Sequence, residues 1–205
     1  MAITKFEQIQ SLFVGQGDIV LFGDPETGVY FADGKDYSNA TIADFINPKS
    51  LGQIVEDSTS WTGDDVSFED IRDEQGDVIT STTTAGTLGF EFDIASVSAD
   101  MVARFMKGTK FASIEGSKVF DGTGATVSGV GFGVGTPVIT APIAWLNDEK
   151  TRMLFFPKAK IAANFSNSDK LMRIHVVVTA EQVDTANLKT AMLLTSTVAA
   201  TGGEE

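Results

Sequence analysis

The sequence predicts a mainly β fold of the α+β class, with one main α-helix at about residues 98–107 and extended arms or loops. Twenty glycines indicate many turns. Fifteen phenylalanines, against two tryptophans and two tyrosines, supply a core whose aromatic rings need no hydrogen-bond partner. Between residues 88 and 106 the apolar spacing changes from every second position to every third or fourth, which indicates a strand followed by a helix.

Length and composition indicate a folded chain. We expect one domain over residues 1–205, because 42% hydrophobic residues against 21% charged ones are enough to build a core. The absence of cysteine excludes disulfides, thiolate nucleophiles and cysteine-based metal sites. No apolar run is long enough to cross a membrane or to form a signal-peptide core, so we expect synthesis and folding in a cytoplasm-like space.

The net charge of −13 disfavours binding to phosphate backbones and to anionic membranes. Residues 56–77 hold nine acidic side chains and one arginine, a contribution of −8 that leaves −5 for the rest of the chain. We therefore expect DNA near this protein to be tolerated rather than bound.

The first elements lie before residue 60. Residues 1–15 fit either an extended arm or a short amphipathic helix, and both alternatives stay open. Residues 18–22 and 29–32 flank a turn sequence, GDPETG, and predict a hairpin. A helical turn is expected to stop at Asn47, because a residue before proline disfavours helical angles.

The middle of the chain predicts two strands within residues 66–84, joined at Gln75, Gly76 and Asp77. The next strand carries an apolar face and a polar face. Its helix is predicted to begin after Ser98 as N-cap and to end at Gly108. The strand and the helix are expected to share a core made of Leu88, Phe90, Phe92, Ile94, Met101, Val102 and Phe105.

The remaining elements complete a sheet. Alternating glycines near residues 129–135 predict a strand with one bare face, suited to close approach or to strong curvature. Residues 153–166 and 171–180 predict two further strands. Residues 180–205 are expected to form a C-terminal arm, with a short helix or docked segment at 185–193 and a mobile tail from 201 to 205.

No motif for catalysis, a cofactor or a metal emerges, so we expect no enzyme activity. His175 lacks a nucleophile motif or a second histidine and is interpreted as an ordinary strand residue. The glycine-rich stretch never matches a phosphate-binding loop, and Gly76 follows Asp73 too closely for a calcium loop. An adventitious divalent ion at the clustered carboxylates remains an alternative. Adjacent acids on a strand point to opposite faces, which favours a solvated acidic surface.

The order of features resembles the major tail tube proteins of tailed bacteriophages. The resemblance covers roughly residues 50–185 and rests on three segments. These are the W-x-G…D-E-Q-G stretch, the junction TLGFEFDIASVSADMVARFM, and the ending P-K-A-K-I…V-T-A-E.

This resemblance implies an antiparallel β-sandwich or barrel of the tail-tube type, flanked by the helix. Six-subunit rings would stack into a tube of the virion tail, assembled in the host bacterial cytoplasm. Its partners would be further copies of itself and other tail proteins, such as the tape measure and the terminator, while DNA passes through without specific binding. Lumen-facing positions are then expected at Glu91 and Asp93, and at Glu69 and Asp73.

Two rival functions remain. A head decoration, connector or tail-completion protein would form single rings or trimers without stacking. A carboxylate-dependent hydrolase would be a monomer with a deep pocket and two converging acids.

Overall fold

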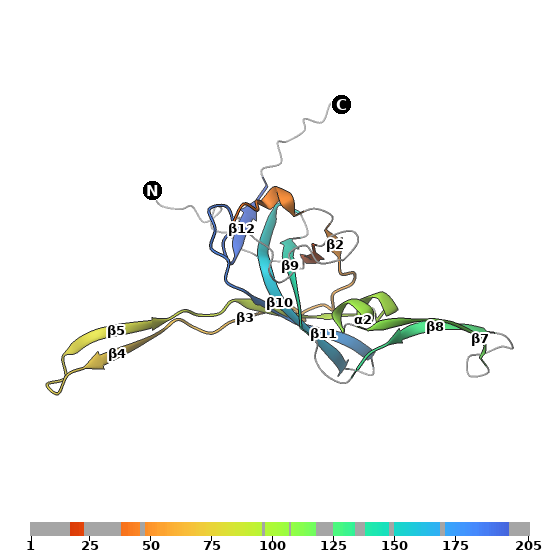
Figure 1. The fold of residues 1–205 in the computed structure, drawn as a ribbon, viewed down its shortest axis with the longest axis horizontal. Helices are drawn as coiled ribbons and strands as arrows, with labels where there is room; N and C mark the ends of the chain where they lie inside the picture. The colour runs from red at the N-terminus through yellow and green to blue at the C-terminus, as the bar shows by residue number, and fades with distance from the viewer. Residues whose placement is uncertain are drawn as a thin grey trace, which may run out of the picture. The chain divides into compact units, whose positions relative to one another are not determined.

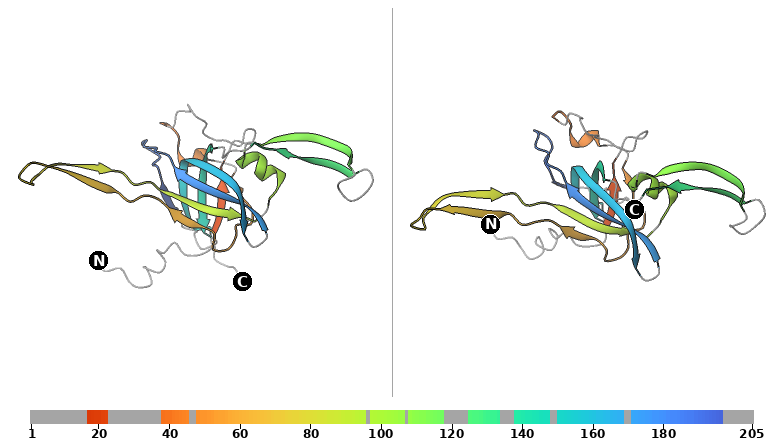
Figure 2. Two further views of the ribbon diagram at one scale, coloured as in Figure 1. Left: turned by 90° about the horizontal axis from the view of Figure 1, so that it is seen from below. Right: turned by 60° about the horizontal axis from the view of Figure 1, so that its bottom comes forward.

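The computed structural model describes residues 17–22, 38–45, 48–95, 97–106, 108–117, 125–133, 138–147, 150–168 and 171–196. Within these ranges the chain is mainly β, with antiparallel pairing and one short α-helix (Figures 1 and 2). The expected arm at 1–15, the strand at 29–32 and the tail at 201–205 lie outside the described residues.

The chain divides into two compact units. The first unit comprises residues 1–52, 141–159 and 181–205, and the second comprises residues 53–140 and 160–180. The elements in chain order are β1 (Gly17–Leu21), η1 (Ile42–Asp44), β2 (Lys49–Ser50), β3 (Ser60–Thr62), β4 (Ser67–Arg72), β5 (Val78–Thr84), β6 (Gly89–Ile94), α2 (Ala99–Phe105), β7 (Thr109–Ser117), β8 (Ala125–Gly131), β9 (Val138–Asn147), β10 (Arg152–Ser168), β11 (Leu171–Ala180) and β12 (Met192–Thr195).

In the first unit the strand order is β2-β1-β9-β10, and β12 pairs with the first residues of β10. Strand β1 lies antiparallel to β9, with Ile19 opposite Trp145. Residues 141–145 of β9 are all buried, which means that both faces of this stretch are covered because strand side chains alternate. The continuous apolar sequence APIAW there is typical of such a strand.

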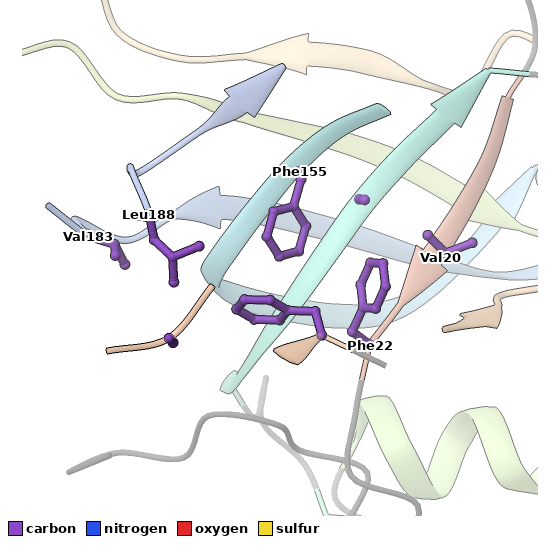
Figure 3. Close-up of a cluster of buried hydrophobic side chains, with 8 residues drawn as sticks. Val20, Phe22, Phe155, Val183 and Leu188 are labelled. Carbon is purple, nitrogen blue, oxygen red and sulfur yellow. The ribbon is translucent and has the colours of Figure 1, made fainter. Parts of the chain in front are cut away.

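The core of the first unit is built around three phenylalanine rings. Phe22, Phe45 and Phe155 contact one another edge to face, with ring centroids 4.7 to 6.4 Å apart. Figure 3 shows Phe155 and Phe22 among the other buried side chains of this cluster. The remaining members are Val20, Ala40, Ala144, Val183 and Leu188.

In the second unit β6 lies between β11 and β3. The antiparallel register places Phe92 opposite Val176 and Phe90 opposite both Val178 and Trp61. These residues share one face of the sheet. Its fully buried members are Phe90, Phe92, Ile94, Ile174, Val176 and Val178.

The helix α2 begins where the sequence predicts. The Ser98 side-chain oxygen accepts a hydrogen bond from the Met101 backbone N–H at 3.2 Å, which satisfies one of the free donors at the helix start. After the last turn, the Gly108 N–H donates to the Ala103 carbonyl at 3.1 Å. A side chain at Gly108 would lie 2.5 Å from a methyl group of Val130, so glycine also permits close packing there.

Two hairpins form two-stranded sheets of their own (Figure 1). The β4–β5 hairpin confirms the predicted strands and turn. Asp73 accepts hydrogen bonds from the N–H groups of Gln75 and Asp77, and Gly76 adopts a left-handed φ of 89°. Strand β8 of the second hairpin contains part of the predicted glycine strand, whereas its partner β7 was not predicted.

The segment at 185–193 is a turn and the start of a strand, so the helical alternative is wrong. The Leu188 N–H donates to the Thr185 hydroxyl at 3.0 Å, and an isolated bridge joins Asp184 to Lys189. Leu188 is fully buried in the first unit, and β12 then pairs with β10. Burial of the leucine and strand pairing outweigh the local helical preference of this segment.

Candidate functional site

The candidate site is a row of polar side chains on the second unit, on the face of β6 opposite its buried phenylalanines. We call it the polar row. Its members come from neighbouring strands that are hydrogen-bonded to one another. They are Ser60 of β3, Glu91 and Asp93 of β6, and Arg173 and His175 of β11.

The local sequence fixes the direction of these side chains. Because side chains alternate along a strand, burial of Phe90, Phe92 and Ile94 turns Glu91 and Asp93 to the other face. Gly89 shares that face and is itself buried. A Cβ atom at Gly89 would lie 2.2 Å from the Val178 carbonyl oxygen, so the close approach of β11 to β6 at this point requires glycine.

Oppositely charged and hydrogen-bonding groups meet across the polar row. His175 Nδ1 lies 2.8 Å from Asp93 Oδ1, and His175 Nε2 lies 3.8 Å from Glu91 Oε2. Arg173 Nη1 lies 3.8 Å from Asp93 Oδ2. The Ser60 hydroxyl donates to Glu91 Oε1 at 2.9 Å. The two carboxylates of β6 are therefore held by β11 on one side, and one of them by β3 on the other.

The backbone of Asp93 is fixed from a second direction. The Val55 N–H donates to the Asp93 carbonyl at 2.9 Å, and the Asp93 N–H donates to the Ser58 hydroxyl at 3.1 Å. Ser58 in turn donates to the Val55 carbonyl at 2.7 Å. These bonds extend the pairing along this edge of β6 to residues that precede β3. They hold the Asp93 backbone so that its carboxylate lies beside β11.

Glu69 and Asp73, the other two expected lumen-facing residues, lie on a different element. Glu69 is exposed on β4, and its backbone carbonyl accepts a long hydrogen bond from Thr82 at 3.4 Å. Asp73 uses its carboxylate to hold the turn of the hairpin. The structure therefore joins Glu91 and Asp93 in one row and places Glu69 and Asp73 on the β4–β5 hairpin.

The residues expected to form the core between strand and helix have different degrees of burial. Phe90, Phe92 and Ile94 of β6 are fully buried. In α2, Phe105 is fully buried and Val102 is 4% exposed. Met101 is half-buried. Leu88 precedes β6 and is 40% exposed, so it lies outside the buried set, although its carbonyl accepts a hydrogen bond from the Ala180 N–H at 2.8 Å.

The sequence alone does not identify Arg173 and His175 as site residues. Alternation along β11 does place both on the polar face of that strand. Their pairing with Asp93 and Glu91, however, depends on the register between two strands about eighty residues apart in the chain, which sequence periodicity does not specify.

The chemistry that this arrangement supports is electrostatic. In the described part of the chain, no group of three or more His, Cys, Asp or Glu side chains could hold a metal ion. Within the same described residues, no helix is long and apolar enough to span a bilayer.

No model of a known protein family matches the sequence, and no curated protein matches it either.

Proposed function

We propose that this chain is a structural subunit that assembles into stacked hexameric rings and forms the tail tube of a tailed bacteriophage. The tube is a conduit through which the genome leaves the virion. In this proposal the chain has no catalytic activity and is assembled in the host cytoplasm, and its partners are other copies of itself and tail proteins such as the tape measure and the terminator.

The exposure of the β4–β5 hairpin is the observation that most supports self-assembly. Every residue of both strands is exposed, including Phe68 at 72%. An isolated two-stranded hairpin is only marginally stable in water, because neither face is covered. Its other exposed apolar side chains are Ile71, Val78 and Ile79. A hairpin of this kind is stabilised when it packs against a second molecule.

Open strand edges support the same conclusion. In the second unit β3 ends the order of paired strands, and it spans only Ser60–Thr62. In the first unit β2 ends the order with two residues, Lys49–Ser50. Repeated head-to-tail contacts between identical subunits cover such edges and close into a ring when the rotation permits.

The polar row supports the conduit part of the proposal. In this assignment Glu91 and Asp93 line the channel, where their carboxylates repel DNA phosphates. Carboxylates also supply no positive charge that could displace the counterions of DNA, and the release of those counterions is what drives binding. The double variant E91Q/D93N is expected to form tubes as the natural protein does, because both side chains lie on the face of β6 opposite Phe90 and Phe92 and the amides keep their hydrogen-bonding oxygens.

Negative-stain electron microscopy of the purified protein tests this function across a range of concentrations. Open-ended tubes of uniform diameter are expected. Single closed rings or trimers that never stack would instead favour a head decoration, connector or tail-completion protein. A monomer at every concentration would contradict the proposal.

A further inference from the structure

Strand β11 places a guanidinium and an imidazole, those of Arg173 and His175, two residues apart on one face. Side chains at this spacing point to the same side of a strand. Arginine binds phosphate oxygens through paired, charge-assisted hydrogen bonds, and an adjacent ring N–H adds a further donor. Side chains of these two kinds, placed side by side, are suited to binding a phosphate group.

The two carboxylates of β6 cover them. Asp93 lies opposite His175 in the register and contacts both of these side chains, at 2.8 Å to the imidazole and 3.8 Å to the guanidinium. Glu91 lies 3.8 Å from the second imidazole nitrogen. Each nitrogen-bearing group of the pair therefore already has a carboxylate partner within the same sheet.

Burial strengthens this cover. The side chains of Arg173 and Asp93 are only 16% and 17% exposed, whereas those of His175 and Glu91 are 32% and 38% exposed. Where water is partly excluded, charges attract one another more strongly and salt screens them less. Asp93 is thus the partner of the guanidinium and the closer partner of the imidazole, and Glu91 is the more distant and more exposed partner of the imidazole.

We propose that Asp93 and Glu91 mask Arg173 and His175, a latent phosphate-binding pair, so that a nucleic acid meeting this face is not held. The inference rests on the proposed function in one respect, because that function supplies DNA as the polymer that meets this face. In this proposal the carboxylates do more than repel DNA. They also pair with the groups that would otherwise bind phosphate.

The test compares the binding of random-sequence duplex DNA to the natural protein and to D93N at low and at moderate salt. Asparagine keeps the shape of the side chain and can still accept a hydrogen bond, but it removes the charge that holds the guanidinium. D93N is expected to bind DNA at least about tenfold more tightly at low salt, with a steep loss of affinity as salt rises. Adding R173Q to D93N is expected to abolish the gain.

The matched control is D184N in the first unit. Asp184 forms an ion pair with Lys189, and both side chains are exposed. This substitution changes the net charge by the same amount, but the lysine it releases is already accessible to solvent. If D184N raises DNA affinity as much as D93N does, net charge alone explains the effect and the masking proposal is overturned. An unchanged affinity of folded D93N overturns it as well.

A second variant covers the case in which D93N does not fold. E91Q removes the more exposed carboxylate, and it is expected to give a smaller gain in DNA affinity that disappears in E91Q/H175Q. No gain in folded E91Q would then contradict the proposal. Binding is compared between samples of equal size on gel filtration, so the result does not depend on whether tubes form, and failure of the tail-tube proposal is seen separately by electron microscopy.

Discussion

At the scale of single residues, Phe155 is a member of the phenylalanine core of the first unit. It is fully buried and contacts both Phe22 and Phe45 through its ring. We predict that F155A lowers the free energy of unfolding by about 3–5 kcal/mol, because the transfer free energy of the ring is lost and a cavity remains. Chemical denaturation followed by circular dichroism measures this change.

Leu193 provides the control for this substitution. It lies on β12, which pairs with the same part of β10, but it is 63% exposed. L193A is expected to change the free energy of unfolding by about 0.5 kcal/mol or less. Equal losses from F155A and L193A would mean that the phenylalanine cluster is not the core of this unit.

A substitution at Gly89 tests how closely β6 and β11 approach each other. The Cβ atom of G89A would lie 2.2 Å from the Val178 carbonyl oxygen, so the two strands must move apart. We predict a loss of about 1–3 kcal/mol in the free energy of unfolding. The matched substitution G131A on β8 meets its nearest atom, the Thr109 carbonyl oxygen, at 3.9 Å and is expected to be tolerated. A tolerated G89A would contradict the strand pairing described for β6.

At the scale of elements, the β4–β5 hairpin is the part that should matter for assembly and not for folding. It forms a sheet of its own, and both of its faces are exposed. The chain segments at its base are adjacent, because Asp64 and Thr87 are joined by hydrogen bonds of 2.9 and 3.1 Å. Residues 66–85 can therefore be replaced by a short Gly/Ser linker without stretching the base.

We predict that this shortened protein unfolds with nearly the same stability as the full chain but forms no tubes. Stability is measured by chemical denaturation, and assembly by sedimentation and electron microscopy. A hairpin of the same length in which Phe68 alone is replaced by serine serves as the milder variant, with assembly weakened rather than lost. Tubes of normal length from the shortened protein would show that assembly does not need the hairpin.

The elements that could be predicted from sequence are those with a strong local signal. The turn at Gly76, the alternation in β6 and β11, and the Ser98 cap each depend on a few neighbouring residues, and each is found where it was expected. The segment around Leu188 has a helical composition, but its conformation depends on burial in a distant core. Local preference cannot predict that outcome.

The candidate site could be predicted in part for the same reason. The carboxylates of Glu91 and Asp93 follow from alternation within one strand. Their partners on β11 depend on long-range register. Asp73, which the resemblance places with them as a lumen-facing residue, belongs to a turn that its own carboxylate holds. Charge in the sequence marks which groups are acidic, but it does not show which of them meet.

At the scale of the whole molecule, the proposed tail-tube function requires that copies of this chain cover the surfaces that one copy leaves exposed. A cryo-electron microscopy reconstruction of the assembled protein measures this most directly, because it gives both the symmetry and the surroundings of the polar row. We predict stacked six-fold rings, with the β4–β5 hairpin packed against another subunit and Glu91 facing a continuous channel. An assembly without a channel, or one in which Glu91 faces the outer surface, would contradict it.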